Sequence, residues 1–155
     1  MTRKVVLVLG LCLVLAAGCA PRVDIEAETA AIKSVLADYI ASVEKEDLEL
    51  YGRTVAPDPA TVHFGTFGAP IVGWASLRKT IEAQNETLSE TTITAGDESI
   101  HVARSGDFAW ATSLWTFTTV MAGKPLELPV RCSWVLEKYE GRWRIVHFHK
   151  SIAAG

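Results

Sequence analysis

The sequence has no excess of basic residues and no apolar segment long enough to span a membrane. It contains 15 lysines and arginines against 18 aspartates and glutamates, a formal net charge of −3 with histidine neutral. This balance argues against a nucleic-acid partner, because nucleic-acid binding depends on clustered lysine and arginine side chains. The apolar run Val5–Ala17 has 13 residues, whereas a membrane-spanning helix needs about 20. We therefore expect neither a nucleic-acid-binding protein nor a transmembrane helix here.

The apolar run instead has the layout of a secretory signal. Arg3 and Lys4 precede it, its last two residues are alanines, and Gly18 follows it immediately before Cys19. The segment resembles the lipobox of bacterial lipoproteins, in which the cysteine receives lipid and becomes the mature N-terminus. The resemblance implies a signal peptide over 1–18, acyl chains such as palmitate on Cys19, and a tether over 19–23. The alternative is an ordinary signal peptide with a chance cysteine.

Lipidation would place the protein in the cell envelope, anchored to a membrane by its acyl chains. It would face the periplasm or the exterior, on the outer membrane if the cell has one. Cys12 would leave with the signal and Cys19 would carry the lipid, so Cys132 could form no intramolecular disulfide. The rest is long enough for one domain with a hydrophobic core, predicted over 24–151 with a tail over 152–155.

The domain changes character near its middle. Apolar residues recur at helical spacing from Asp24 to about Tyr51 and from Trp74 to Leu88. The segment Gly52–Gly73 is rich in proline and glycine, which indicates a loop with one short strand near 62–64. Alternating β-branched and aromatic residues then predict strands at 91–95, 98–104, 107–120, 126–138 and 142–151. Helices followed by an antiparallel sheet predict an α+β domain whose sheet curls round the first helix.

The turn at Tyr139–Gly141 decides which side chains share a face of the sheet. We expect a three-residue loop that pairs Lys138 with Arg142, since Glu-Gly is not a favoured two-residue turn. A two-residue loop would reverse the facing of one strand. The three-residue loop gathers on one face Arg131, Ser133, Val135, Trp143, Ile145, His147 and His149. A turn at Ala122-Gly123 adds Trp110, Thr112 and Leu114 to that face.

The opposite face carries three large rings, those of Trp115, Trp134 and Phe148. With no predicted helix left to cover it, this face would be an exposed apolar patch, which usually marks an interface. We therefore expect a homodimer that forms through these rings. The alternative is a different register that places the rings inside.

Several segments together resemble a known family. Gly73-Trp74 opens the second helix, Gly106-Asp107-Phe108-Ala109-Trp110 opens a strand, and residues 141–151 are Gly-Arg-Trp-Arg-Ile-Val-His-Phe-His-Lys-Ser. This pattern resembles the SnoaL-like group of the nuclear transport factor 2-like superfamily, relatives of ketosteroid isomerase. The resemblance implies a cone-shaped, cystatin-like roll with a pocket between sheet and helices. The superfamily includes isomerases, cyclases, dehydratases and non-enzymatic binding or assembly modules, so the fold does not choose the function.

The predicted pocket contains two histidines. His147 and His149 lie two residues apart on a strand and therefore point the same way, and imidazoles exchange protons near neutral pH. With Tyr39 they would resemble the tyrosine and histidine machinery of dehydratases in the superfamily. They could equally hydrogen-bond Ser133, Tyr39 or the backbone and only close the cone. The full set of candidate pocket residues is Tyr39, Trp74, Trp110, Arg131, Ser133, His147 and His149.

Other chemistry has weaker support. A catalytic zinc needs three protein ligands, and only His63 or an acidic residue could join the two histidines, so we expect no metal and no cofactor. An isomerase of the ketosteroid type needs a pocket carboxylate, but neither Asp38 nor Asp58 is clearly placed. Arg131, on a predicted inward position, would pair with Asp38 or another acid, or bind an anionic ligand.

We therefore expect a domain that binds a small, partly apolar or aromatic molecule without catalysis. The first alternative is a lyase or isomerase that uses His147 and His149 as acid and base. The second is an interaction or scaffold module that acts through the face carrying Trp115, Trp134 and Phe148.

Overall fold

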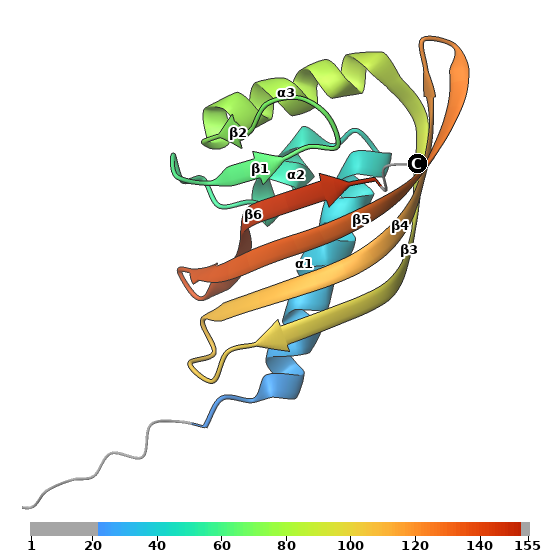
Figure 1. Cartoon of the computed structure of the whole chain (residues 1–155). Coiled ribbons are helices and arrows are strands. Elements are labelled where there is room, and N and C mark those ends of the chain that lie inside the picture. The colour runs from blue at the N-terminus through green and yellow to red at the C-terminus, as the bar shows by residue number, and fades with distance from the viewer. Residues whose placement is uncertain (1–21, 153–155) are drawn as a thin grey trace, which may run out of the picture.

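The computed structural model describes residues 22–152 as helices on one side of a single curved sheet (Figure 1). The strands lie in the order β2 (Ile71–Val72), β1 (Val62–Phe64), β6 (Arg142–Ser151), β5 (Lys124–Tyr139), β4 (Phe108–Met121) and β3 (Leu88–Val102). The prediction of an α+β domain with a curved sheet wrapped round N-terminal helices is confirmed. The predicted signal peptide, the lipidation site Cys19 and residues 153–155 lie outside the described residues.

The predicted first helix is two helices. α1, Ile25–Glu44, begins at Asp24, whose side chain accepts a hydrogen bond from the Ala27 amide at 3.1 Å. After α1 the chain turns at Glu46, which has a positive φ of 56°. A second capping aspartate then starts α2, Leu48–Thr54. The helical periodicity continued through this corner, but a left-handed residue followed by a new N-cap ends one helix and begins another.

Six strands and a third helix complete the domain. α3, Trp74–Thr87, runs directly into β3. β1 is parallel to β6 and every other neighbouring pair is antiparallel. β3 is continuous where two strands were predicted, and one of its two register shifts, between Gly96 and Ser99, lies where the break was expected.

The turn between β5 and β6 differs from the prediction. Tyr139 pairs with Arg142, so the loop contains two residues and the expected pairing of Lys138 with Arg142 is wrong. Glu140 and Gly141 both have positive φ, 51° and 76°. Positive φ at both central residues is the conformation of a type I′ turn, which suits the twist of a two-residue hairpin. Here Glu140 adopts it although glutamate is an uncommon residue there.

A β-bulge then changes the facing within β6. Val135 pairs with His147 and Leu136 with Ile145, which leaves Val146 as an extra residue. Trp143 and Ile145 are therefore buried, whereas His149 is exposed. The prediction that Trp143 and Ile145 share a face with the two histidines is wrong, because strict alternation does not continue through a bulge.

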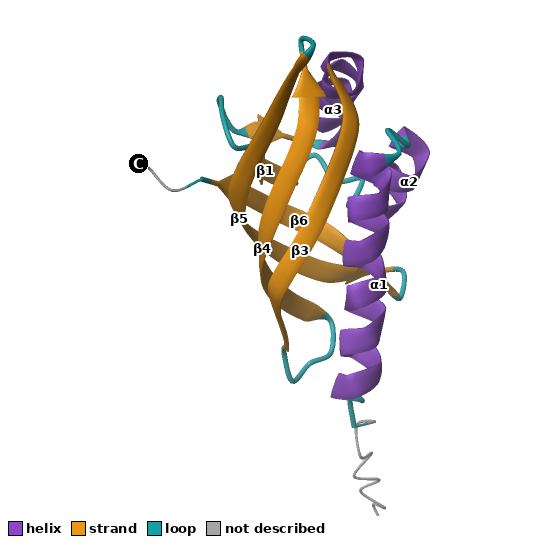
Figure 2. Cartoon of the chain, turned by 90° about the vertical axis from the view of Figure 1, so that its right-hand side faces the viewer, coloured by secondary structure: helices purple, strands orange, loops and turns teal. Residues whose placement is uncertain are grey.

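The helices cover the face of the sheet that carries Trp115, Trp134 and Phe148, which we call the inner face (Figure 2). These rings are 2–3% exposed, and Trp134 stacks on Phe148 with ring centroids 5.1 Å apart. The dimer surface predicted through them is therefore wrong, since α1 takes the place expected for a partner. A homodimer stays a prediction, and it would need another surface. The opposite, outer face carries exposed Trp110 and Leu114.

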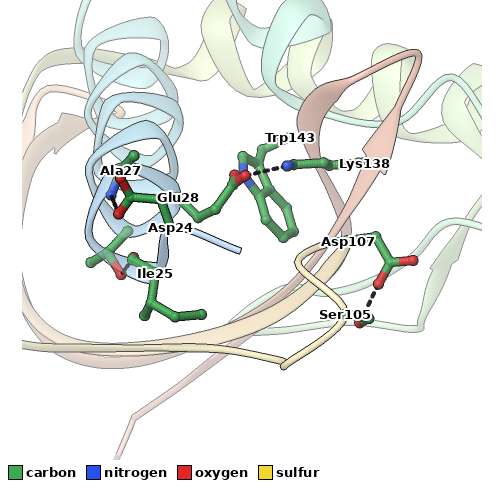
Figure 3. A network of polar contacts seen from close by, with 9 residues as sticks. Asp24, Ile25, Ala27, Glu28, Ser105, Asp107, Lys138 and Trp143 are labelled. Carbon is green, nitrogen blue, oxygen red and sulfur yellow. Dashed lines mark hydrogen bonds and ion pairs between the residues drawn. The ribbon is translucent and has the colours of Figure 1, made fainter. Parts of the chain in front are cut away.

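A small polar network fixes the start of α1 to the last hairpin (Figure 3). Glu28 accepts a hydrogen bond from the Trp143 indole at 2.8 Å and forms an ion pair with Lys138. The hydrogen bonds from Lys138 and Trp143 lower the pKa of Glu28. The network holds α1 across the inner face, and with it the side chains that α1 contributes to the cavity. No helix within residues 22–152 has the length and apolar character needed to cross a membrane.

Candidate ligand-binding site

A cavity of about 250 Å³ lies between the three helices, the segment after β1 and the inner face. Its wall is mostly apolar, with contributions such as Leu77, Ile81 and Val130. No aspartate or glutamate is among the described residues that line it. Four titratable side chains with polar ends do line it: Tyr39, Tyr51, His63 and Lys150.

Tyr39 on α1 and Tyr51 on α2 form a buried pair. Their hydroxyl oxygens are 3.4 Å apart, and both side chains are 1% exposed. Burial raises the pKa of both hydroxyls well above the ordinary value of 10. Both therefore stay protonated at neutral pH. Since only one hydroxyl can donate to the other, the pair retains a proton that can be donated to a ligand oxygen.

His63 on β1 reaches the cavity because β1 lies beside β6 and pairs His63 with Phe148. The side chain is 3% exposed, and its Nε2 atom has no hydrogen-bond partner within residues 22–152. Burial, with smaller contributions from His147 and Lys150, lowers its pKa from 6.5 to about 4. The imidazole is therefore neutral at neutral pH. Buried polar atoms nearly always have a hydrogen-bond partner. The Nε2 atom of His63 is therefore available to form a hydrogen bond with a bound ligand.

Lys150 lies on β6 two residues after Phe148 and therefore shares its inner face. Its ammonium lies 5.4 Å from the centroid of the Phe148 ring, close enough for a cation–π contact. It forms no ion pair with any residue of 22–152. Burial lowers its pKa. The cavity thus contains a cation without a protein counter-ion.

Only some of the predicted pocket residues lie near this cavity. Tyr39 forms part of its wall. Trp74 lies behind Tyr51, with stacked rings 6.4 Å apart, and does not line the cavity. Trp110 is 45% exposed on the outer face, where it stacks on His101 at 4.0 Å.

The two predicted histidines also lie on the outer face. They pair with Val135 and Ser133 of β5, and that whole set faces away from the helices. The His147 Nδ1 atom is 2.9 Å from the Val62 carbonyl oxygen, and its side chain borders a separate open depression. His149 is exposed beside Phe64. The prediction that these imidazoles enter the cavity is wrong, because the helices cover the other face.

Arg131 is also on the outer face, where it donates a hydrogen bond to the Ile152 carbonyl at 3.0 Å. The expected ion pair with Asp38 does not form. His63 faces inward while His147 and His149 face outward, so the three cannot bind one metal ion. Within residues 22–152, no group of three metal-binding side chains occurs.

The sequence-based prediction missed Tyr51 and Lys150, and it considered His63 only as a metal ligand. The sequence did contain a signal for Lys150. It follows Phe148 by two residues on a strand, so the two side chains lie on the same face of the sheet. Tyr51 belongs to a helix that was predicted as the end of α1. His63 depends on the pairing of β1 with β6, which brings together residues 85 positions apart and has no local signal.

Comparison with known proteins gives a consistent picture. A family model for the SnoaL-like domain matches residues 32–155. No curated protein matches the chain. Among solved structures, a nuclear transport factor 2-like superfamily protein from Salmonella enterica serovar Typhimurium has a TM-score of 0.77 and 27% identity, covering 84% of this chain and 94% of that one.

Two further structures share the fold. A ketosteroid isomerase-like protein from Erwinia carotovora has a TM-score of 0.70 and 19% identity, covering 83% of this chain and 98% of that one. A protein with a cystatin-like fold from Caulobacter vibrioides has a TM-score of 0.71 and 17% identity, covering 83% and 91%.

Proposed function

The chain belongs to the SnoaL-like domain family, and we propose that it binds a small, partly apolar molecule in the cavity between its helices and sheet. The observation that carries the proposal is the cavity itself: an apolar wall with a few polar groups converging on it. Ligand sites in proteins typically have this composition. The volume of about 250 Å³ suits a small molecule of up to three rings.

The polar groups would orient the ligand. The Tyr39–Tyr51 pair lies at the helical side, and His63 lies at the strand side. Both tyrosines and the imidazole are neutral at neutral pH, so burying them costs less than burying ions. A ligand with one polar end and an apolar body would satisfy the unpartnered His63 Nε2 atom and fill the apolar remainder.

Binding is testable with N-phenyl-1-naphthylamine, an uncharged probe that fluoresces in apolar surroundings. We expect saturable binding by the wild-type protein. Leu128→Trp, which adds a ring at the cavity wall, should weaken binding strongly. Glu127→Trp is the matched control, since Glu127 is exposed, precedes Leu128 on β5 and does not line the cavity. Absence of saturable binding, or equal loss in both variants, would contradict the proposal.

Proton transfer is a second candidate function, as in a lyase or isomerase. His63 favours it, because a neutral buried imidazole with an unpartnered Nε2 atom can accept a proton from a bound ligand. The likeness to a ketosteroid isomerase-like protein is compatible with this function. If the domain is an enzyme, His63→Gln should abolish turnover of a substrate while binding persists. Turnover unchanged by His63→Gln would exclude this role for His63.

We also propose that the domain is held at the cell envelope by lipid on Cys19. The described chain supports the geometry of such an anchor. Tyr39 lies 15 residues after Asp24, which corresponds to about 22 Å along α1 at 1.5 Å per residue. If α1 stands upright on the membrane, an anchor before it would hold the cavity away from the membrane surface. Metabolic labelling with an alkyne-tagged palmitate should label the wild-type protein and not Cys19→Ser; labelling of both would contradict the proposal.

A further inference from the structure

We infer that the ligand of this cavity is an organic acid, and that its carboxylate binds the Lys150 ammonium while its apolar body fills the remaining space. The inference rests on the proposed function and specifies its ligand class. Three observations carry it: an unpaired cation, an unpartnered imidazole beside it, and walls that contain no competing acid.

The first observation is the charge of Lys150. Lys150 is half-buried, and the burial of its ammonium lowers its pKa. Withdrawing a lysine ammonium from water without a partner is costly. Within residues 22–152 Lys150 has no ion pair, and its only described stabilising contact is the face of the Phe148 ring. A carboxylate would provide a charge-assisted hydrogen bond, the strongest kind available to an ammonium.

The second observation is the position of His63. The pairing of His63 with Phe148 places it on the strand next to β6, on the same inner face as Lys150. Both side chains line the cavity, and the Lys150 charge makes a small contribution to the lowered pKa of His63. A carboxylate has two oxygens. One could bind the ammonium, while the other accepts a hydrogen bond from the His63 Nε2 atom when that nitrogen carries the proton.

The third observation is the neutrality of every other titratable group near the ammonium. Cys132 pairs directly with Lys150 across β5 and β6, and burial raises its pKa to about 12. The hydroxyls of Tyr39 and Tyr51 stay protonated for the same reason. The described wall offers no carboxylate, so a bound acid would be the counter-ion of Lys150. The apolar wall favours an acid with a ring or short chain over an inorganic anion.

The experiment compares acids with their uncharged amides in displacing N-phenyl-1-naphthylamine. The pairs are benzoate with benzamide and 2-naphthoate with 2-naphthamide, at pH 7, with inorganic phosphate as a third arm. For the wild-type protein we expect at least one acid to bind about tenfold more tightly than its amide, the ratio expected for one charge-assisted hydrogen bond. Phosphate should displace the probe poorly.

Two variants of Lys150 and one control locate the effect. Lys150→Gln should bring the acid and amide to similar affinity, and Lys150→Arg should keep much of the preference for the acid. Lys124→Gln, at an exposed lysine outside the cavity, should leave the preference unchanged. Thermal unfolding of each variant establishes that it is folded. If Lys150→Gln does not fold, Lys150→Arg still tests whether a cation at this position is needed for the preference for acids.

The outcomes separate the two proposals. If the neutral probe binds but no acid binds more tightly than its amide, the inference is wrong while the proposed function stands. A preference for acids that persists in Lys150→Gln overturns it too, as does displacement by phosphate as strong as by the acids. If neither the probe nor any of the compounds binds, the proposed function itself fails.

Discussion

The two faces of the sheet use similar residues for different purposes. On the inner face, Trp134 stacks on Phe148 under the helices and is 2% exposed. On the outer face, Trp110 stacks on His101 and is 45% exposed. Histidines divide in the same way, with His63 buried at the cavity and His149 exposed. Residue type therefore does not reveal which side chains form the site, because the covering helices decide it.

The largest contrast is expected between two tryptophans. Trp134→Ala should lower the free energy of unfolding by about 3–5 kcal/mol, because it removes a buried ring and leaves a cavity. Trp110→Ala, which removes a ring of the same size from the outer face, should cost less than about 1 kcal/mol. Urea denaturation of both variants, followed by far-UV circular dichroism, measures the difference. Similar losses in the two variants would contradict the assignment of the faces.

The second contrast is between two histidines as the pH falls. The folded-state pKa of His63, about 4, lies below its ordinary value of 6.5. Between these values the unfolded chain binds a proton that the folded protein does not, so stability falls as pH falls from 6.5 to 4. The loss reaches at most about 3.4 kcal/mol, at 1.36 kcal/mol per pKa unit.

Denaturation curves between pH 4 and 7 test this second contrast. His63→Gln should flatten the pH dependence across that range. His149→Gln, at an exposed position of the outer face, should leave it in place. An unchanged slope in His63→Gln would show that His63 is not the group that titrates.

A smaller effect is expected at the network that positions α1 over the inner face. Glu28→Gln should lower the free energy of unfolding by about 1 kcal/mol at pH 7, since it removes an ion pair with Lys138 and weakens the hydrogen bond from Trp143. The pKa of Glu28 is lowered in the folded state, so this contribution is present above pH 4.5 and is lost as pH falls through the folded-state pKa.

Thermal unfolding at pH 7 and at pH 3 measures the Glu28 contribution. The difference between the variant and the wild type should be larger at pH 7 than at pH 3. Glu26→Gln is the control, because Glu26 is an exposed residue in the same first turn of α1. An equal effect in Glu26→Gln would mean that only the charge near the helix N-terminus matters.

The smallest effect concerns the turn that helps to fix the register of β6. Glu140→Asn should raise the free energy of unfolding by about 0.5 kcal/mol, because asparagine tolerates the positive φ of 51° better than glutamate. Ala122, with a φ of 52° in the preceding hairpin, should respond to Ala122→Asn in the same way. Glu127→Asn, inside β5, should give no gain, as asparagine is unfavourable in strands. Chemical denaturation of the three variants measures these differences in the free energy of unfolding.

Much of the fold could be predicted from periodicity, because helices and strands leave local signals. The short strand expected near 62–64 is β1, and the second predicted helix is α3. The facing of the strands could not be predicted, because it depends on the length of one turn and on one extra residue, Val146. Each changes the facing while leaving composition and alternation almost unaltered.

The candidate site was harder to predict than the fold. Tyr39 lies on a helix whose apolar residues recur at regular helical spacing. This spacing correctly predicted that its side chain faces the cavity. His63 and Tyr51 reach the cavity through long-range pairing and through a corner after α1, and neither leaves a pattern in a short window of sequence. His147 and His149 share a face with each other, as their spacing indicates, but spacing alone does not say where the helices pack.

The extra residue at Val146 divides β6 into two parts that make different contacts. The half nearer the hairpin supplies Trp143, which fastens the first helix through Glu28. The half after the bulge supplies Phe148 and Lys150 to the hollow. The bulge at Val146 separates the two halves. Substitutions in the second half that change which compound binds therefore need not disturb the contact between Trp143 and Glu28. The strand can thus acquire new binding specificity while its mechanical anchor is conserved.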